Sequence, residues 1–405
     1  MSHHKPTPKL SDDLTTLGKL APPLLRGALL IGLIGVVAAI LLGINQGDAM
    51  RRFSFSYLVS FAFYLSISLG ALFFIAIGHL TRSSWNVVVR RLAEIMAVNL
   101  PWLGLLGLPL IWLAPQLFPW AGTGGSVAPE LLAHKSGYLN LPFFGIRYIG
   151  FFLVWSILSI YYWRRSLKQD SSGDPGLTVE MERRSGLAIV LYAITVTLIS
   201  YDLLMSLDPA WFSTIFGPYF FTGGLVGFFA LLTITTGWLQ RQGRLKTVIH
   251  VEHLHDYGKL LFAFIFFWAY LAFSQYMLYW YANIPEETAW LIRRQTNGWQ
   301  YLGLILLFGH FLIPFAGLIS RYAKRSKPVL TFWAIWVFVM HYCDLYWIAM
   351  PEFSAATPAP HLLDLACFLG LGGFYIAGLA YVARNRSLVP TRDPRLADSL
   401  GFENA

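Results

Sequence analysis

The octapeptide MHYCDLYW, residues 340–347, lies inside an apolar run that extends from Leu330 to Met350. It places His341 and Asp344 three residues apart, at positions that share one face of a helix. A charged side chain at the centre of a bilayer costs at least ~2.5–3.5 kcal/mol on insertion scales, so such residues usually face the interior of a helical bundle and often have a functional role. The run therefore predicts a membrane span that carries a polar site.

The composition of the whole chain is that of a membrane protein. Of its 405 residues, 56% are hydrophobic and 13% are charged, whereas an ordinary soluble domain is about 25% charged. The two cysteines, Cys343 and Cys367, lie in apolar runs, which excludes a disulfide framework and an iron–sulfur site built from about four thiolates. The first twenty residues are polar, so we expect no cleavable signal peptide and interpret the first apolar run as a membrane anchor.

The apolar runs predict an all-α integral membrane protein with ten transmembrane helices. A helix needs about 20 apolar residues to cross the hydrocarbon core, and lipid cannot satisfy irregular backbone. Charged or Gly/Pro-rich segments separate the runs, and none of them is long enough for an extramembrane catalytic domain. The predicted spans cover residues 22–45, 55–79, 87–113, 141–163, 185–207, 214–239, 259–281, 298–320, 329–350 and 362–383.

The distribution of lysine and arginine predicts the orientation of these spans. With the N-terminus inside, 22 of the 30 basic residues fall in cytoplasmic segments and five in outside segments. This asymmetry follows the positive-inside rule, so we expect both termini in the cytoplasm and no nucleic-acid partner for the net charge of +9. The chain divides into an N-terminal arm (1–21), a ten-span membrane domain (22–383) and a C-terminal tail (384–405). The tail lacks apolar periodicity, so we expect contacts to order it, and both ends are long enough to clasp neighbouring subunits.

Further ionisable residues lie within the predicted spans, at different depths. Imidazoles and carboxylates bind protons with affinities that a protein can tune towards neutral pH. Groups ordered by depth are what a proton relay across the membrane needs. The predicted relay consists of His79 and Glu94 on the inner side, His310 and His341 at the centre, and Asp344, Asp202 and Arg147 on the outer side.

Most of these residues also have a structural interpretation. Glu94 and Arg90 have the i, i+4 spacing of a helical ion pair. Arg147 could form a buried bridge with Asp202 or Asp344 that fixes helix packing. Single residues have simpler alternatives: a hydrogen bond to a neighbouring helix for His310, an interfacial position before the SLDP turn for Asp202, and solvation near the surface for Asp364.

Haem and zinc are alternatives for the histidines. His310 and His341 are the one central pair that facing helices could offer as axial haem ligands. The inner segment 240–259 carries three histidines beside acidic residues, which fits a zinc site, a proton-collecting surface or an ordinary solvated loop. The aromatic residues between 266 and 276, Trp268 included, are interpreted as core and lipid-facing packing. We expect no cofactor in this chain.

Three stretches carry a resemblance to a known family. They are SYDLLMSLDPAWFSTIFGPYFF (200–221), SQYMLYWYANIPEETAWLIRR (274–294) and the tail VPTRDPRLADSLGFENA (389–405). With the ten-span plan, they resemble the NrfD-like integral subunits of the bacterial alternative complex III. The length and the tail are similar to the ActF family of these subunits.

The resemblance implies a fold and a set of partners. The expected fold has two four-helix bundles and two additional helices, in the bacterial cytoplasmic membrane. The expected partners are haem c subunits, an iron–sulfur subunit and a paralogous NrfD-like subunit that binds quinol, usually menaquinol. The haem c groups, the iron–sulfur clusters and the menaquinol are expected in those partners, and this chain is also expected to contact other subunits of the complex and lipid.

The resemblance and the buried ionisable groups lead to one main hypothesis. We expect a subunit of a quinol-oxidising electron-transfer complex that has no redox centre of its own, conducts protons through half-channels and supports the complex. The alternatives are a quinol-binding subunit with an intramembrane His/Asp site, a secondary transporter with a midplane site, and a passive scaffold whose buried charges are all structural.

Overall fold

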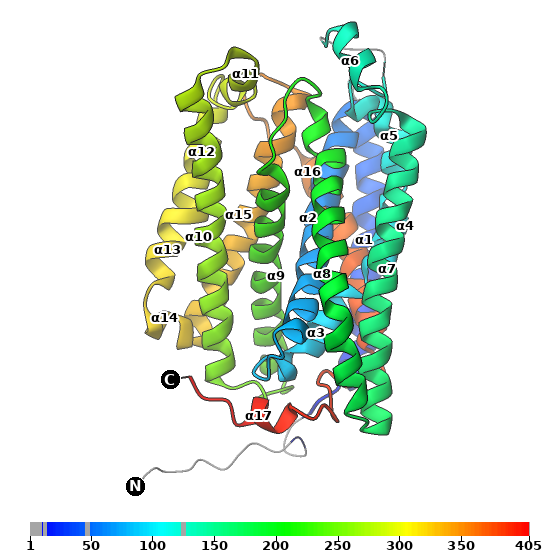
Figure 1. Ribbon diagram of the computed structural model, residues 1–405, viewed down its shortest axis with the longest axis vertical. Coiled ribbons are helices and arrows are strands. Elements are labelled where there is room, and N and C mark those ends of the chain that lie inside the picture. The colour runs from blue at the N-terminus through cyan, green and yellow to red at the C-terminus, as the bar shows by residue number, and fades with distance from the viewer. Residues whose placement is uncertain (1–9, 11–13, 45–48, 123–126, 405) are drawn as a thin grey trace.

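The protein folds as a bundle of long helices that run roughly side by side (Figure 1). The computed structural model describes residues 10, 14–44, 49–122 and 127–404. Within these residues the chain forms helices and no strands, and two isolated bridges join Leu14 to Arg244 and Thr16 to Ser387.

Nine helices of the described chain are long and apolar enough to cross a membrane, or ten if one bent pair counts as a single span. The protein is therefore an all-α, multi-pass membrane protein, and the predicted apolar runs are found as helices. The spanning helices are α1 (Ala21–Ile44), α2 (Ala49–Leu80), α7 (Leu141–Ser172), α8 (Gly176–Leu203), α9 (Phe216–Arg241), α10 (Val251–Ala282), the joined α12 (Trp299–Ile305), η4 (Leu306–Leu312) and α13 (Ile313–Leu318), α15 (Lys327–Phe353) and α16 (Leu362–Ala383).

The bent pair corresponds to the third predicted span. It contains α3 (Val87–Ala97), α4 (Leu100–Gly107) and α5 (Pro109–Leu117), with a bend of 58° before α5. Proline lacks an N–H donor and clashes with the preceding helical turn. Pro101 at the start of α4 and Pro109 at the start of α5 therefore explain why one apolar run is divided among three helices.

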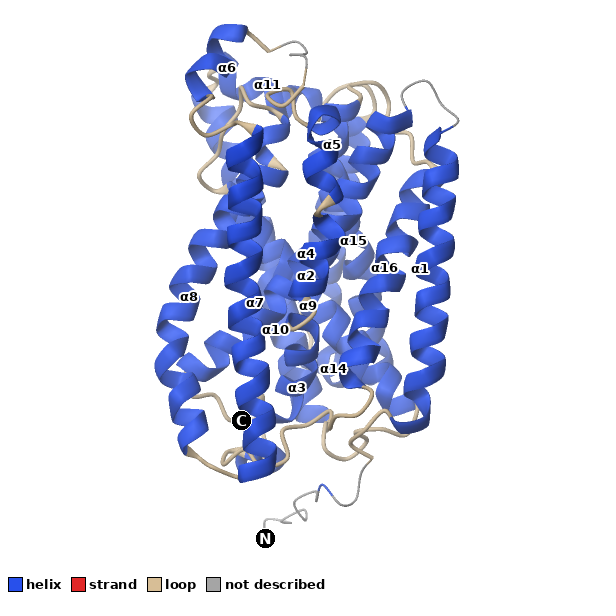
Figure 2. Cartoon of the chain, turned by 90° about the vertical axis from the view of Figure 1, so that its right-hand side faces the viewer, coloured by secondary structure: helices blue, strands red, loops and turns tan. Residues whose placement is uncertain are grey.

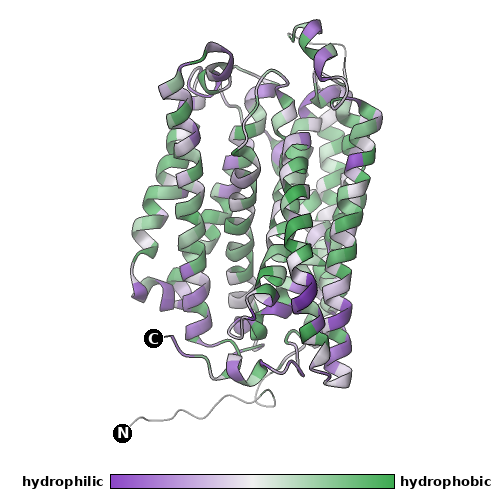
Figure 3. Ribbon diagram, in the orientation of Figure 1, coloured by the Kyte–Doolittle hydropathy of each residue, from purple (hydrophilic) through white to green (hydrophobic). Residues whose placement is uncertain are grey.

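Polar residues and short helices gather at the two ends of the bundle (Figure 3). We call the end that carries the tail and the 242–250 loop the basic end, because most lysines and arginines belong to its segments. The remaining helices are α6 (Pro129–Lys135), η3 (Met205–Leu207) and α11 (Pro285–Arg293) at the opposite end, and η2 (Gly18–Leu20), α14 (Arg321–Arg325) and α17 (Leu396–Leu400) at the basic end.

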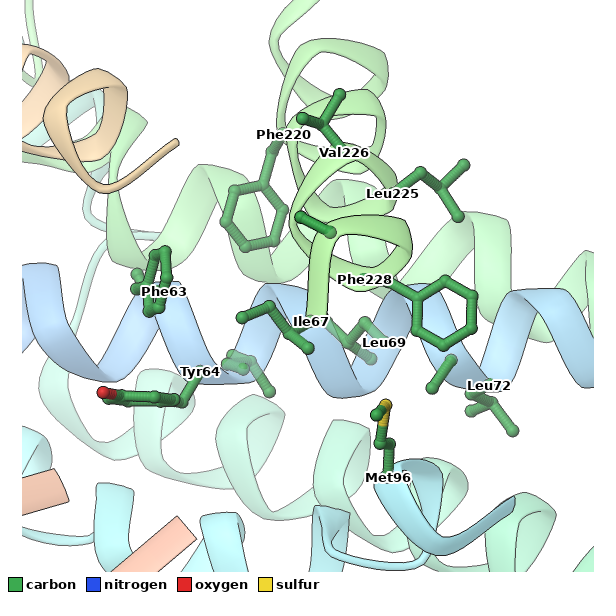
Figure 4. Close-up of a cluster of buried hydrophobic side chains, with 14 of the residues drawn as sticks. Phe63, Tyr64, Ile67, Leu69, Leu72, Met96, Phe220, Leu225, Val226 and Phe228 are labelled. Carbon is green, nitrogen blue, oxygen red and sulfur yellow. The ribbon is translucent and has the colours of Figure 1, made fainter. Parts of the chain in front are cut away.

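Helix α2 lies at the centre of the bundle and contacts α3, α8, α9, α15 and α16. Figure 4 shows Ile67 and Leu72 of α2 near Phe228 of α9 and Met96 of α3, within one buried hydrophobic cluster. Small hydroxyl residues let membrane helices approach closely and hydrogen-bond to one another. Five of them are buried on α2: Ser54, Ser56, Ser60, Ser66 and Ser68.

Helices α1 and α16 form a close pair at one side of the bundle (Figure 2). A Cβ atom added to Gly35 would lie 2.4 Å from the backbone nitrogen of Gly370, and one added to Gly373 would lie 2.2 Å from that of Gly32. Only glycine allows two helix backbones to approach this closely. The other face of α1 is exposed along Leu33, Ile34 and Leu41, among others, as expected for a helix in contact with lipid.

Candidate functional site

The carboxylate of Asp344 lies in the interior of the bundle, with 2% of the residue exposed. The hydroxyl of Tyr219 on α9 donates a hydrogen bond to its Oδ1, and the indole N–H of Trp268 on α10 donates to its Oδ2 at 3.1 Å. A buried carboxylate without such donors would be strongly unfavourable. One acidic group on α15 is thus held by side chains from two neighbouring helices.

His341 lies one turn from Asp344 towards the basic end, and its Nε2 is 2.8 Å from the Oγ of Ser66 on α2. Ser66 donates its own hydroxyl proton to the backbone oxygen of Phe63 at 2.8 Å. Because a serine has one proton to donate, the proton of the first bond belongs to His341 Nε2. In this tautomer Nδ1 carries a lone pair, and it has no hydrogen-bond partner among the described residues.

Two glycines of α9 make room for the His341 ring. A Cβ atom added to Gly223 would lie 3.3 Å from Nδ1 of His341 and 3.8 Å from Oδ2 of Asp344. One added to Gly227 would lie 2.8 Å from Cδ2 of His341. Residues four apart share one face of a helix. Because these two glycines have no side chain, they leave space for both ionisable groups on that face of α9.

Replacing Gly227 with alanine is expected to move the His341 ring away from Ser66. The added methyl group would also lie 3.0 Å from Ile67, and overpacking of this kind costs about 1–3 kcal/mol. Denaturation of the purified protein in mixed detergent micelles measures the loss of stability. Gly186→Ala is the control, because nothing lies within 4 Å of its Cβ position, and equal stability of both variants would contradict the close fit.

His310 is buried on the π-helical turn η4, and its ring centre lies 3.9 Å from the ring centre of Trp268. Neither of its nitrogens has a hydrogen-bond partner among the described residues. Pro314 cannot donate a backbone hydrogen bond to the carbonyl four residues earlier, which is that of His310, and this accounts for the widened turn. Such turns are frequent at functional sites. Trp268 therefore contacts both His310 and Asp344, and we call Ser66, Tyr219, Trp268, His310, His341 and Asp344 the central polar cluster.

The two central histidines, which the sequence offers as a haem pair, contact different neighbours in the bundle. Nε2 of His341 is hydrogen-bonded to Ser66, and the ring faces the backbone of α9 at Gly223 and Gly227. His310 lies against the indole of Trp268. Each histidine ring is thus in contact with another helix of the described chain.

Arg147 and Asp202 form a separate ion pair between α7 and α8. Nε and Nη2 of Arg147 donate to the two carboxylate oxygens of Asp202 at 2.8 and 3.0 Å. The guanidinium also lies over the ring of Tyr138, 3.8 Å from its centre. Of the two bridges predicted for Arg147, the one with Asp202 is present, and Asp344 has other partners. Two-point pairing of this kind favours a structural role.

Glu94 belongs to a buried ion network near the basic end. One of its oxygens lies 3.1 Å from Nε of Arg90, and the other lies 3.0 Å from Nε of Arg91. The predicted i, i+4 pair with Arg90 is therefore confirmed. Arg90 also pairs with Asp393 of the tail at 2.7 Å, and Arg91 pairs with Asp170 of α7 at 2.7 Å.

The tail is ordered by contacts with the helices of its own chain. Burial alone would raise the pKa of Asp393, but the guanidinium groups of Arg90 and Arg395 outweigh burial and hold this pKa below its usual value. Ser399 accepts a hydrogen bond from the backbone N–H of Val88 and donates one to Trp85. As predicted, the tail is ordered by contacts with other segments. The contacts found join it to helices of the same chain.

Two further predicted positions, Asp364 and His79, are both buried. Asp364 is 6% exposed and accepts from Arg52 at 2.7 Å and from Ser56 at 2.5 Å, so the expectation of solvation is wrong. Its position at the start of α16 attracts donors from α2. His79 is buried and stacks on Tyr162 with ring centres 5.5 Å apart, and neither of its nitrogens has a hydrogen-bond partner among the described residues.

Two of the three histidines of the 240–259 segment, His250 and His253, take part in capping α10. His250 precedes α10 and accepts from the backbone of Glu252 at 3.3 Å. The Nε2 atom of His253 is 3.0 Å from the carbonyl oxygen of Ser399. These contacts join the start of α10 to the tail, which is a structural use that the sequence interpretation did not include.

The structure brings together three of the seven predicted relay residues, namely His310, His341 and Asp344. No hydrogen bond or ion pair between described residues directly joins them to the pair Arg147–Asp202, to Glu94 or to His79. Sequence reasoning missed Ser66, Tyr219 and Trp268, and the interpretation of Trp268 as packing alone was incomplete. Polar or amphipathic side chains in the spans that face His341 and Asp344 were the available signal.

A polar cavity of about 560 Å³ opens at the end opposite the basic end. Glu352 of α15 lines this cavity, two helical turns from Asp344. Arg294 is buried. It donates hydrogen bonds to the carboxylate of Glu352 at 3.1 Å and to the backbone oxygen of Ile348 at 2.5 Å. Burial lowers the pKa of Arg294 to about 10, so this guanidinium remains charged at neutral pH.

Comparisons with known protein families and with curated proteins found no match to this chain.

Proposed function

We propose that this chain is a proton-conducting integral subunit of a quinol-oxidising electron-transfer complex, and that protons pass through the central polar cluster. The observation that carries the proposal is the position of Asp344 and His341, both buried one helical turn apart on α15 inside the bundle. Buried ionisable residues in a membrane domain are usually kept for a function. An acid and an imidazole on one helix face can each bind and release a proton.

The chemistry of the pair follows from its hydrogen bonds. In the neutral tautomer, Nδ1 of His341 accepts a proton, while Ser66 holds Nε2. Asp344 releases a proton while Tyr219 and Trp268 stabilise its carboxylate. His310 lies on the other side of Trp268 and has two unpartnered nitrogens among the described residues, so it supplies a third proton-binding position in the cluster.

Access from the two membrane faces is the next requirement. The polar cavity beside Glu352 supports an aqueous path from the end opposite the basic end. Arg294 donates hydrogen bonds to Glu352, which lines that cavity, and to the backbone oxygen of Ile348, one helical turn from Asp344. Towards the basic end, Glu94 and His79 remain the predicted members of the path.

The assignment to a complex rests on the sequence resemblance. In this proposal α1 and α16, which pack against each other, are the two additional helices beside two four-helix bundles. Haem c, iron–sulfur clusters and menaquinol belong to partner subunits in this proposal, and both termini face the cytoplasm of a bacterial cell.

Exchange of Asp344 for asparagine, or of His341 for phenylalanine, tests the proton role. In vesicles that contain the assembled complex, we expect proton translocation per electron to fall about tenfold or more, because a positioned acid or base contributes roughly 10²–10⁴ to proton-transfer rates. Quinol oxidation is expected to continue. Asp398→Asn, an exposed acid of the tail, is the control. An unchanged ratio of protons to electrons in both variants would refute the proposal.

A second candidate function, quinol binding, is favoured by a pocket beside Tyr219. Gln275, Tyr276, Trp290 and Trp347 line it, and Tyr219 connects it to Asp344. Its volume of about 70 Å³ is small beside the roughly 300–1,000 Å³ of usual ligand sites, so a quinone ring would need the aromatic walls to move. A photoreactive quinone that labels this pocket in the wild-type complex, but not in a Gln275→Leu variant, would support it.

A further inference from the structure

An apolar groove opens at the side of the bundle near the basic end. It has a volume of about 270 Å³ and is bordered by the starts of η2 and α1, by α3, α9 and α16, and by the first residues of the tail. Leu92 of α3, Ile234 of α9 and Leu379 of α16 line it, and Thr235 brings the one hydroxyl group of the lining. In a membrane, such a groove is in contact with hydrocarbon chains.

Three exposed basic residues follow lining residues of this groove closely in the sequence. The lining residues that lie closest in sequence to these basic residues belong to three segments of the chain. These segments meet at the basic end. Each segment continues from a lining residue to an exposed basic residue within two positions: Leu17 to Lys19, Leu239 to Arg241, and Ala383 to Arg384.

Acidic residues do not balance this charge. Glu94 is the one acidic residue in the bordering segments 17–24, 92–96, 231–239 and 376–388, and it is buried in ion pairs with Arg90 and Arg91. The segments that line the groove therefore lead into an excess of positive charge at the basic end.

Amphipathic aromatic residues mark the same level of the groove. Trp238 lines it near the basic end. The ring of Tyr381 lies 4.0 Å from the guanidinium carbon of Arg384. Tryptophan and tyrosine are typical of the boundary between hydrocarbon and headgroups, which indicates that the nearby basic residues lie at headgroup depth.

We propose that this groove binds an acidic phospholipid. One acyl chain lies along the groove, and the phosphate with its anionic headgroup lies among Lys19, Arg241 and Arg384. Basic pockets between membrane helices recognise anionic headgroups in this way. The apolar lining contacts the acyl chain, and the basic residues neutralise the negative charge of the headgroup. A zwitterionic lipid with the same acyl chains therefore binds more weakly.

The charge requirement is tested on the delipidated full-length chain in detergent, by native mass spectrometry. Phosphatidylglycerol and phosphatidylcholine with identical acyl chains are added in equal amounts. The wild type is expected to retain phosphatidylglycerol preferentially, and Lys19→Gln and Arg384→Gln are each expected to weaken that binding about fivefold. Arg321→Gln is the matched control, because Arg321 is exposed at the same end on α14, outside the groove.

The groove itself is tested by filling it. Leu379→Trp is expected to remove the bound phosphatidylglycerol, whereas Leu369→Trp, on the same helix at a 43% exposed position outside the groove, is expected to leave it. Gel filtration and circular dichroism check that each variant is folded. If Leu379→Trp does not fold, the charge variants Lys19→Gln and Arg384→Gln test the proposal. Equal binding of both lipids by the wild type, or an equal effect of Arg321→Gln and Arg384→Gln, would overturn the proposal. So would a photo-crosslinker at position 379 that captures another subunit of the complex instead of lipid.

Discussion

Replacing Glu94 with glutamine is expected to lower the free energy of unfolding by about 3–5 kcal/mol, the usual cost of breaking a buried ion pair from one side. Glu94 neutralises Arg90 and Arg91 at distances of 3.1 and 3.0 Å, and the side chains of all three are almost completely buried. Without its charge, two guanidinium groups remain in the interior with only the carboxylates of Asp393 and Asp170 beside them.

Denaturation in mixed detergent micelles measures this change. The control is Glu180→Gln, because Glu180 pairs with Arg165 and Arg184 at 3.1 and 3.0 Å but is 28% exposed. Exposed pairs contribute about 0–1 kcal/mol. A loss of stability no larger for Glu94→Gln than for Glu180→Gln would show that the network at the basic end does not stabilise the fold.

The second large effect is expected for Arg147→Gln, which leaves the carboxylate of Asp202 buried without its guanidinium partner. We again expect a loss of about 3–5 kcal/mol. The double variant Arg147→Gln/Asp202→Asn is expected to recover much of that stability, because it removes both charges. Arg147→Lys is expected to recover little, since lysine cannot form the two parallel hydrogen bonds to Asp202.

This double variant also separates the structural and relay interpretations of Arg147 and Asp202. The pair lies between α7 and α8, whereas the central polar cluster lies on α2, α9, α10, η4 and α15. We therefore expect proton translocation by the double variant to remain close to that of the wild type. A loss as large as that of Asp344→Asn would restore Arg147 and Asp202 to the relay.

Helices, their approximate bounds and the buried polar residues were accessible to sequence reasoning. Long apolar runs can form little other than helices in lipid, so the positions of the spans followed directly. The ends were less accurate: α7 continues to Ser172 and α10 begins at Val251, because a helix extends through its charged ends into the interface. The proline at the start of α5 was the signal for the broken third span.

Partners of the buried residues were not accessible, because they come from segments far apart in the chain. The i, i+4 pair of Glu94 and Arg90 could be predicted from spacing alone. The bond from Trp268 to Asp344 joins residues 76 positions apart, and that between Ser66 and His341 joins residues 275 positions apart. Such contacts depend on which helix faces which, and hydrophobic periodicity in a fully apolar span does not specify that.

The most direct test of the account is whether Asp344 exchanges protons with water. Infrared difference spectroscopy of the purified protein, recorded across neutral pH in H₂O and D₂O, detects the carbonyl band of a protonated carboxyl group. The account predicts a band that is absent in Asp344→Asn, that changes with pH and that shifts in D₂O within seconds. An Asp344 whose band neither titrates nor exchanges with D₂O would contradict a role in proton conduction and leave the cluster with a structural role only.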